Sequence, residues 1–374
     1  MTKQRVTPLF LLFNLRYNKT VPDIWADVVA RPGVEESIMQ LIIFDLEWNI
    51  GYQKRTFDYK GAEQTLRGEI IQIGAVKVDE TGQVQDRFSV TLRPRIFRKL
   101  QHRIAKVTGL TQQQLDSGVP IRDGLDRFLK WCGPDAALAE WGPDDVPVLK
   151  QNLYLNGYDE SWPHQWYDLQ QVFLSQKPRG EGEGMTLESV ITRLGLPMDE
   201  PFHDALSDAA YTAAVCRCID LPAGLAAYPS QEDQLRRAAC PEGGEYAGFE
   251  ILGPALTREV WRENPDMQRI VCPVCGAPLV PETQDLWLER GSNGYYSLFS
   301  CVQHGQWLAR FKLAQPDGLH WNIVRVYERP SRIQLDKWVK EKKLWLQHQK
   351  ERAEALAGAE AAGESAAPEP KRDE

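Results

Sequence analysis

Residues 41–48 read LIIFDLEW, an apolar run that carries two acidic residues, Asp45 and Glu47. A short run rich in isoleucine, leucine and phenylalanine is typical of a buried strand. Because side chains alternate along a strand, the two acids project from one face, opposite Phe44 and Leu46. Burying neighbouring carboxylates is costly unless a divalent cation compensates them. The run therefore predicts either a divalent-cation site or a strand with one hydrated face.

The segments that follow alternate between strand-like and helix-like patterns as far as about residue 220, which is typical of helices packed on a sheet. We expect strands at 69–79, 87–94 and 137–141, and helices at 121–132, 145–157, 186–196 and 205–219. The turn-forming DETG at 79–82 predicts that the first two of these strands pair antiparallel with 41–48. The segment therefore predicts an α/β fold, with a mixed sheet flanked by helices.

The length of 374 residues exceeds the about 100–200 that is typical of one domain. We expect an N-terminal extension at 1–38, a first domain at 39–220, a linker at 221–268, a small β-rich domain at 269–330, a charged C-terminal helix at 331–358 and a disordered tail at 359–374. No apolar run approaches the about 18 residues that cross a bilayer, which excludes an integral membrane protein and predicts no membrane partner.

The charge and the cysteine content narrow the class of protein further. Lysine and arginine number 44 against 52 acidic residues, a net charge of −8, so contact with nucleic acid requires a local basic patch. Seven cysteines are too few for a disulfide scaffold of this length. We therefore expect a reducing compartment and a cytoplasmic location.

Further acidic residues stand at two informative places. Asp144 and Asp145 fall where a predicted strand turns into a helix, where their side chains can reach those of a neighbouring strand. His203 lies in a predicted loop, five residues before Asp208 in the first turns of a helix. Each feature alone also fits a structural role, because acids cap helices and lone histidines are often structural.

In combination, these motifs resemble the DEDDh 3′–5′ exonucleases, a superfamily with a ribonuclease H-like fold that includes ribonuclease T and polymerase proofreading subunits. The resemblance covers about residues 40–220 and is carried by FDLEW, EIIQIGAV, KVTGLTQQQLD, EWGPDDVPVL, WYDLQQVF and LGLPMDEPFHDALSDA. The middle motif reads W-G-x-x-D, as in the exonucleases that trim histone mRNA and small RNAs.

The resemblance implies that four carboxylates hold two Mg²⁺ or Mn²⁺ ions: Asp45, Glu47, Asp145 and Asp208. His203 is then the general base, since an imidazole can accept a proton from water near neutral pH. We prefer Asp145 to Asp144 because the family aspartate is followed three and four residues later by apolar residues, here Val148 and Leu149.

The implied activity is two-metal hydrolysis of RNA or single-stranded DNA from the 3′ end, which releases nucleoside 5′-monophosphates. Two alternatives remain: a catalytically idle nucleic-acid-binding adaptor and a polymerase-associated proofreading subunit. The sequence does not distinguish RNA from DNA, and it predicts no particular protein partner.

The local basic patch that the net charge requires lies between Arg87 and Lys106, where seven lysines and arginines stand without an acidic residue. We call it the basic strip; its members suited to following a phosphate backbone are Arg93, Arg95, Arg98, Lys99, Arg103 and Lys106. A solvated loop is the alternative. Trp48 is expected either to contact the terminal base or to lie in the core.

Two short motifs in the C-terminal part predict a metal site. Cys272-Pro-Val-Cys275-Gly and Cys301-Val-Gln-His304-Gly each place two ligands three residues apart, with a glycine directly after the second. Two such turns close a tetrahedral site, so we expect one structural Zn²⁺ in a zinc-ribbon-like domain. A redox pair or buried thiols are the alternative.

Overall fold

The computed structural model describes residues 40–364 except 179, 181–183, 242–244 and 292. The expected N-terminal extension at 1–38 lies outside the described residues. The chain divides into two compact units, which we treat separately. The first comprises residues up to Asp233 with Pro316–Leu319, and the second comprises Gln234–Gln315 with His320–Glu374.

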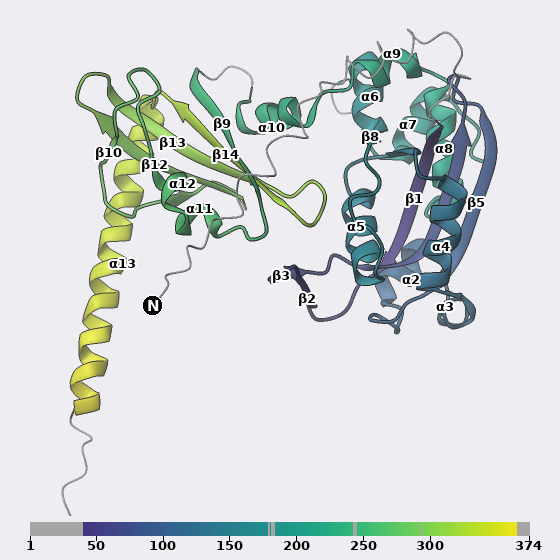
Figure 1. Ribbon diagram of the computed structural model, residues 1–374, viewed down its shortest axis with the longest axis horizontal. Coiled ribbons are helices and arrows are strands. Elements are labelled where there is room, and N and C mark those ends of the chain that lie inside the picture. Colours follow the sequence, from purple (N-terminus) through teal and green to yellow (C-terminus); the bar gives the residue numbers. More distant parts are fainter. Residues whose placement is uncertain (1–39, 179, 181–183, 242–244, 292, 365–374) are drawn as a thin grey trace, which may run out of the picture. The chain divides into compact units, whose positions relative to one another are not determined.

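The first unit is built on a six-stranded mixed sheet with the order β6-β5-β4-β1-β7-β8 (Figure 1). The strands are β1 Leu41–Asn49, β4 Glu69–Val78, β5 Val84–Arg93, β6 Val119–Pro120, β7 Ala137–Glu140 and β8 Trp166–Asp168. β4 is antiparallel to both β1 and β5, whereas β7 is parallel to β1 and β8 is parallel to β7. The predicted mixed α/β class is confirmed.

Alternation along β1 divides the core into two layers. Phe44 and Leu46 face a cluster that includes Phe128 of α4 (Ile121–Cys132) and Leu149 of α5 (Asp145–Leu155). Ile43 faces the opposite cluster, with Ala213 of α8 (Ala205–Cys216). The other elements of this unit are β2 Thr56–Tyr59, β3 Ala62–Thr65, α2 His102–Thr108, α3 Gln112–Ser117, α6 Leu169–Gln176, α7 Leu187–Leu194 and α9 Leu221–Ala226.

Gly74 of β4 fixes how closely α8 approaches the sheet. A Cβ atom at this position would lie 2.0 Å from the backbone of Ala205 and Leu206, so only glycine allows the contact. Gly74 pairs with Asp45 of β1. The first turn of α8 therefore lies beside the acidic positions of β1.

The second unit contains a five-stranded antiparallel path with the order β10-β12-β13-β14-β9, and β11 pairs with β12. Its strands are β9 Tyr246–Ala255, β10 Val280–Pro281, β11 Leu288–Glu289, β12 Gly294–Cys301, β13 Gly305–Ala314 and β14 Trp321–Glu328. One face buries an aromatic cluster around Trp261, Trp307 and Phe311. A β-rich C-terminal region is confirmed.

The expected linker at 221–268 differs from the structure. This stretch contains α9, α10 (Gln231–Ala239), β9, α11 (Val260–Glu263) and α12 (Pro265–Gln268). β9 pairs with β14 at the edge of the second sheet. Its Gly253, with φ +100°, and Pro254 suggest a break in the sequence, but both residues are tolerated in an edge strand.

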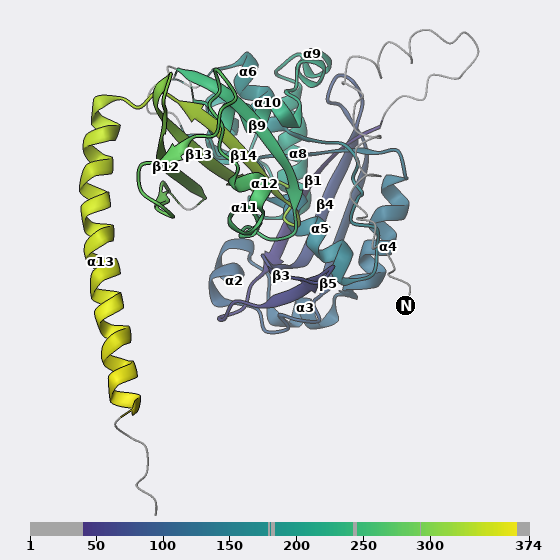
Figure 2. The ribbon, with the colours of Figure 1, turned by 60° about the vertical axis from the view of Figure 1, so that its left-hand side comes forward.

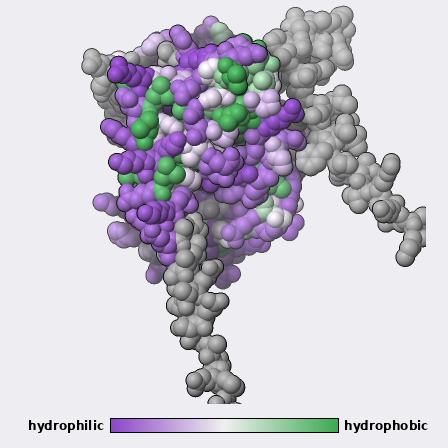
Figure 3. Space-filling model, turned by 90° about the vertical axis from the view of Figure 1, so that its left-hand side faces the viewer, coloured by the Kyte–Doolittle hydropathy of each residue, from purple (hydrophilic) through white to green (hydrophobic). Residues whose placement is uncertain are grey.

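The chain continues into one long helix, α13 (Arg332–Glu364), where we expected a charged helix at 331–358 and a tail at 359–374 (Figure 2). Leu335, Trp338 and Trp345 near its start pack on the second sheet. Exposed apolar residues on α13 include Ile333 and Val339. The face in Figure 3 carries its hydrophobic residues in separate patches among hydrophilic ones. Among the described helices, none is long and apolar enough to cross a membrane.

Candidate active site and metal centre

The first unit brings the predicted acidic residues together from three elements. Asp45 and Glu47 lie on β1, and Asp208 lies in the first turns of α8. Asp145 begins α5, and its Oδ1 accepts a hydrogen bond from the backbone N–H of Leu46 at 3.1 Å. Ligand atoms of Glu47, His203 and Asp208 all lie within 4.8 Å of one another. We call Asp45, Glu47, Asp145 and Asp208 the carboxylate cluster.

The electrostatics of this cluster reflect crowding of like charges. Burial, reinforced by the charges of Asp145, Asp208, Glu47 and Glu140, raises the pKa of Asp45 well above its usual range. Burial and the neighbouring acids raise the pKa of Glu47 to about 8. Burial also raises the pKa values of Asp145 to about 8 and of Asp208 to about 6, even though each accepts a backbone hydrogen bond. The cluster is therefore short of positive charge.

The residues present fit a divalent cation. Oδ2 of Asp208 accepts the backbone N–H of His203 at 3.0 Å, whereas its buried Oδ1 has no hydrogen-bond partner among the described residues. A buried oxygen without a partner is costly, and cation binding is a common compensation. Carboxylate oxygens are also the ligands that Mg²⁺ and Mn²⁺ prefer.

The structure distinguishes the two adjacent aspartates. Asp145 is buried and contacts β1 through Leu46, whereas Asp144 is exposed and caps no backbone N–H of α5. This geometry supports Asp145 as the cluster member.

Sequence reasoning missed a fifth acid, Glu140 at the end of β7. Its side chain is 1% exposed, and its Oε2 accepts the backbone N–H groups of Asp145 at 2.6 Å and of Val146 at 3.1 Å. It thus caps α5, where Asp144 does not. Glu140 lies within the quoted motif EWGPDDVPVL, but nothing in the local pattern separates it from an ordinary strand residue.

Gln72 of β4 is a second residue that sequence reasoning missed. Its Nε2 donates to Oδ2 of Asp204 at 2.8 Å, and its Oε1 accepts the backbone N–H of Ala205 at 3.3 Å. Gln72 pairs with Glu47 in the sheet. It therefore connects the first turn of α8 directly to the strand position next to a cluster acid.

His203 lies at the rim of the cluster, with an exposed side chain and a left-handed backbone at φ +63°. A non-glycine residue in this region is uncommon, and such strain often accompanies function. Its backbone N–H bonds to Asp208. The strained backbone thus accompanies an imidazole that faces the carboxylates and is open to solvent.

The predicted substrate contacts come from three elements of the first unit. Arg95 and Arg98 lie in the loop after β5, whereas Arg103 is on α2, and all three side chains are exposed. Trp48 is half-buried and packs against the core cluster of Phe44. This contact supports the core alternative for Trp48 that the sequence left open.

In the second unit, the two cysteine motifs converge. Cys272, Cys275, Cys301 and His304 place their ligand atoms within 4.8 Å of one another. Sγ of Cys275 lies 3.8 Å from Sγ of Cys301, and Nδ1 of His304 lies 3.6 Å from Sγ of Cys301. Gly276 and Gly305, with φ values of +70° and +68°, end the two turns. A metal ion fits this centre by ligand type and spacing.

The first unit combines a mixed sheet with a cluster of acids on its central strand β1. Comparison with known proteins identifies the class of protein that has these features. Residues 42–216 match the family model described as an exonuclease domain. This part of the chain belongs to that exonuclease family and has a ribonuclease H-like fold.

Relatives cover only part of the molecule. The "Probable 3′-5′ exonuclease KapD" of Bacillus subtilis is 34% identical over 119 residues, 31% of this chain and 54% of KapD. Human "ERI1 exoribonuclease 2" is 25% identical over 212 residues, 46% of this chain and 27% of that protein. A solved structure described as "3′-end specific recognition of histone mRNA stem-loop by 3′-exonuclease" has a TM-score of 0.41 and 16% identity, and covers 54% of this chain and 70% of its own.

Proposed function

We propose that this protein is a metal-dependent 3′–5′ exonuclease that hydrolyses RNA or single-stranded DNA to nucleoside 5′-monophosphates. The observation that carries the proposal is the convergence of Asp45, Glu47, Asp145 and Asp208 from three segments that lie far apart in the sequence. All four acids fall within the part of the chain that matches the exonuclease family. Two relatives, named as a probable 3′–5′ exonuclease and an exoribonuclease, support the proposed polarity and the class of substrate.

The carboxylate cluster would hold two Mg²⁺ or Mn²⁺ ions. When bound, the ions supply stabilisation of the charge that develops on the attacking and leaving oxygens. Asp145 is held against β1 by the N–H of Leu46, and Asp208 is held by the N–H of His203. The protein thus orients its ligands before substrate arrives.

His203 would take the proton of the attacking water. Its side chain is exposed, so water reaches the imidazole directly. Its ring lies beside Glu47 and Asp208, with ligand atoms of all three residues within 4.8 Å of one another. The backbone hydrogen bond to Asp208 keeps the loop beside the cluster.

The idle adaptor and the proofreading subunit are weaker proposals. An adaptor has no need for an acid cluster whose members raise one another's pKa values. A proofreading subunit has no evident use for a second unit with its own metal centre. The motif W-G-x-x-D around Asp145 also differs from that of the polymerase proofreaders.

For the second unit we propose one structural Zn²⁺ at Cys272, Cys275, Cys301 and His304. A tetrahedral ion with Zn–S of about 2.3 Å and Zn–N of about 2.0–2.1 Å needs S···S near 3.8 Å and S···N near 3.6 Å. The observed S···S distance of 3.8 Å and S···N distances of 3.6 and 3.7 Å agree. None of the described cysteines forms a disulfide, which agrees with the proposal of a reducing, cytoplasmic location.

Matched 5′-labelled RNA, single-stranded DNA and duplex, incubated with purified protein and Mg²⁺ or Mn²⁺, test the activity. The expected product is a ladder that shortens from the 3′ end, with nucleoside 5′-monophosphates released. Reactions without added divalent ion should leave the strands intact. Internal cuts at early times, or intact strands under every condition, would reject the proposal.

A further inference from the structure

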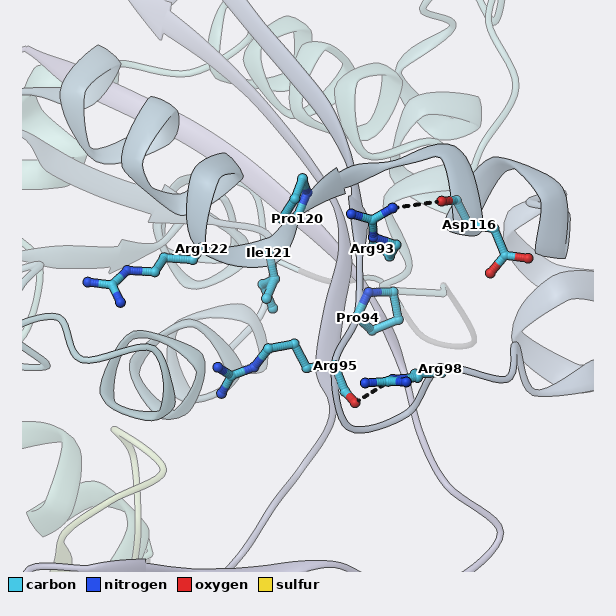
Figure 4. A pocket seen from close by; sticks show the side chains of 8 residues that line it. All are labelled: Arg93, Pro94, Arg95, Arg98, Asp116, Pro120, Ile121 and Arg122. Carbon is cyan, nitrogen blue, oxygen red and sulfur yellow. Dashed lines mark hydrogen bonds between the residues drawn. The ribbon is translucent and has the colours of Figure 1, made fainter.

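A basic cavity of about 480 Å³ lies in the first unit where the loop after β5 meets the start of α4 (Figure 4). Four arginines and one acid line it, with Pro94, Pro120 and Ile121 between them: Arg93, Arg95, Arg98, Arg122 and Asp116. In Figure 4, Arg95 and Arg122 extend in the same direction, with Ile121 between them. We call this cavity the arginine pocket.

The charge of the arginine pocket is not neutralised by the protein. Three of its guanidinium groups donate to backbone carbonyls: Arg93 to Asp116, Arg95 to Leu155 and Arg98 to Arg95, at 3.3, 3.3 and 3.2 Å. Among the described residues, none of the four arginines forms an ion pair within 4.0 Å. Neutral carbonyls therefore orient the side chains without cancelling their charge.

Buried side chains hold the loop that carries these arginines. The carboxylate of Glu69, 2% exposed, accepts the backbone N–H groups of Arg95, Ile96 and Phe97 at 2.6–2.7 Å. Asn49 is fully buried, and its Nδ2 donates to the carbonyls of Phe97 and Lys99. Asn49 lies two residues after Glu47, so the loop is anchored to the strand that carries the carboxylate cluster.

We propose that the arginine pocket binds internal phosphodiester groups of the strand whose 3′ end occupies the carboxylate cluster. Planar guanidinium groups match phosphate oxygens in geometry and charge, and they remain protonated at every working pH. The inference rests on the proposed exonuclease function and adds a second contact, upstream of the scissile bond.

The register of the sheet gives the approximate distance between the carboxylate cluster and the arginine pocket. Glu47 pairs with Gln72, and Gln72 pairs with Thr91, so Arg93 lies two strands across and two residues further along. Strand spacing and rise place the Cα atoms of Glu47 and Arg93 about 12 Å apart. This separation exceeds the length of a mononucleotide, so we expect only a longer strand to contact the cluster and the pocket together. Recognition is expected to be independent of base sequence.

The test compares two double variants of equal charge change. Arg95→Gln/Arg122→Gln removes two pocket arginines, and Arg127→Gln/Lys130→Gln removes two exposed cations of α4 that do not line the pocket. The Kd of a fluorescent single strand of about 12 nucleotides is measured with Ca²⁺ in place of Mg²⁺. The pocket variant should bind about tenfold or more weakly, with a reduced salt slope, and the control within about twofold.

The small ester bis(p-nitrophenyl) phosphate separates this inference from the activity itself. For the pocket variant, the ratio of kcat/KM for the strand to kcat/KM for the ester should fall about tenfold. Equal losses in both double variants would overturn the inference. If the wild type binds the strand through the pocket but cleaves neither substrate, the exonuclease proposal fails and the phosphate site stands. Because Arg95 also bonds Leu155, Arg122→Gln alone provides a variant that leaves the loop contacts intact.

Discussion

The backbone N–H of Asp145 donates to Oε2 of Glu140 at 2.6 Å, while Oδ1 of Asp145 accepts the N–H of Leu46. Asp145 is thus fixed between the end of β7 and the middle of β1. Glu140 itself is 1% exposed and has no direct route to substrate. It is a positioning residue that acts through Asp145.

Removing the Glu140 carboxylate should loosen the start of α5 and weaken the metal site. We expect Glu140→Ala to lower activity about 10–100-fold at low Mn²⁺, the range for residues that orient ligands. Raised Mn²⁺ should recover much of the loss, and Glu140→Gln, which keeps an acceptor oxygen, should be milder. Activity titrated against Mn²⁺ measures this. A loss that is equal at all Mn²⁺ concentrations would argue against positioning.

Metal-free protein should lose stability as the pH rises. Glu47 and Asp145 have pKa values of about 8 in the folded chain, against 4.5 and 3.8 as ordinary values. The folded state then holds protons that the unfolded state has released, so stability falls between about pH 4 and 8. Melting temperatures across this range in buffer without divalent ions measure the effect.

Two controls sharpen this measurement. Mn²⁺ should raise the melting temperature more at pH 8 than at pH 5, because it replaces the missing positive charge. Asp145→Asn should raise the metal-free melting temperature at pH 8 by about 2–4 °C. A melting temperature that is highest at pH 8 without metal would show that the acids are not crowded as described.

The left-handed backbone of His203 allows its imidazole to be tested apart from its conformation. Asparagine adopts positive φ readily but cannot act as a general base. His203→Asn should therefore keep the melting temperature while cleavage falls about 10²–10⁴-fold. His203→Ala should show the same loss with a lower melting temperature. Wild-type turnover in His203→Asn would remove the base assignment.

The second unit should carry one Zn²⁺ per chain when it is purified without chelator. Cys301→Ser should release the ion and make residues 269–330 sensitive to protease, because the turns around Gly276 and Gly305 close on the metal. Cys240→Ser, which alters a thiol outside the cluster, serves as the control. Elemental analysis that finds no zinc in the wild type, or full zinc in Cys301→Ser, would contradict the assignment.

The sequence predicts those features of the molecule that depend on a pattern within a few neighbouring residues. The acids Asp45 and Glu47 were expected on one face of β1 because strand alternation is read directly from LIIFDLEW. The two cysteine motifs were expected to converge because their ligand spacing is short and repeated. In each case the chemistry and the spacing lie within a few residues.

The features that the sequence did not predict depend on contacts between segments that are distant in the sequence. Glu140, Gln72 and Gly74 act on α5 and α8 through tertiary contacts that no periodicity records. Likewise, β9 is a strand because β14 supplies its partner, despite its glycines and proline. Arg122 joins Arg95 only when the start of α4 meets the loop after β5.

Cleavage of a 5′-labelled single strand by Asp145→Asn and Asp144→Asn, with Mn²⁺, tests the central claim most directly. The two substitutions are chemically identical and adjacent in the sequence. Asp145 is buried and belongs to the carboxylate cluster, whereas Asp144 is exposed and lies outside it. We expect the wild type and Asp144→Asn to shorten the strand from its 3′ end, and Asp145→Asn to leave it intact. Shortening by Asp145→Asn at the wild-type rate would contradict the account.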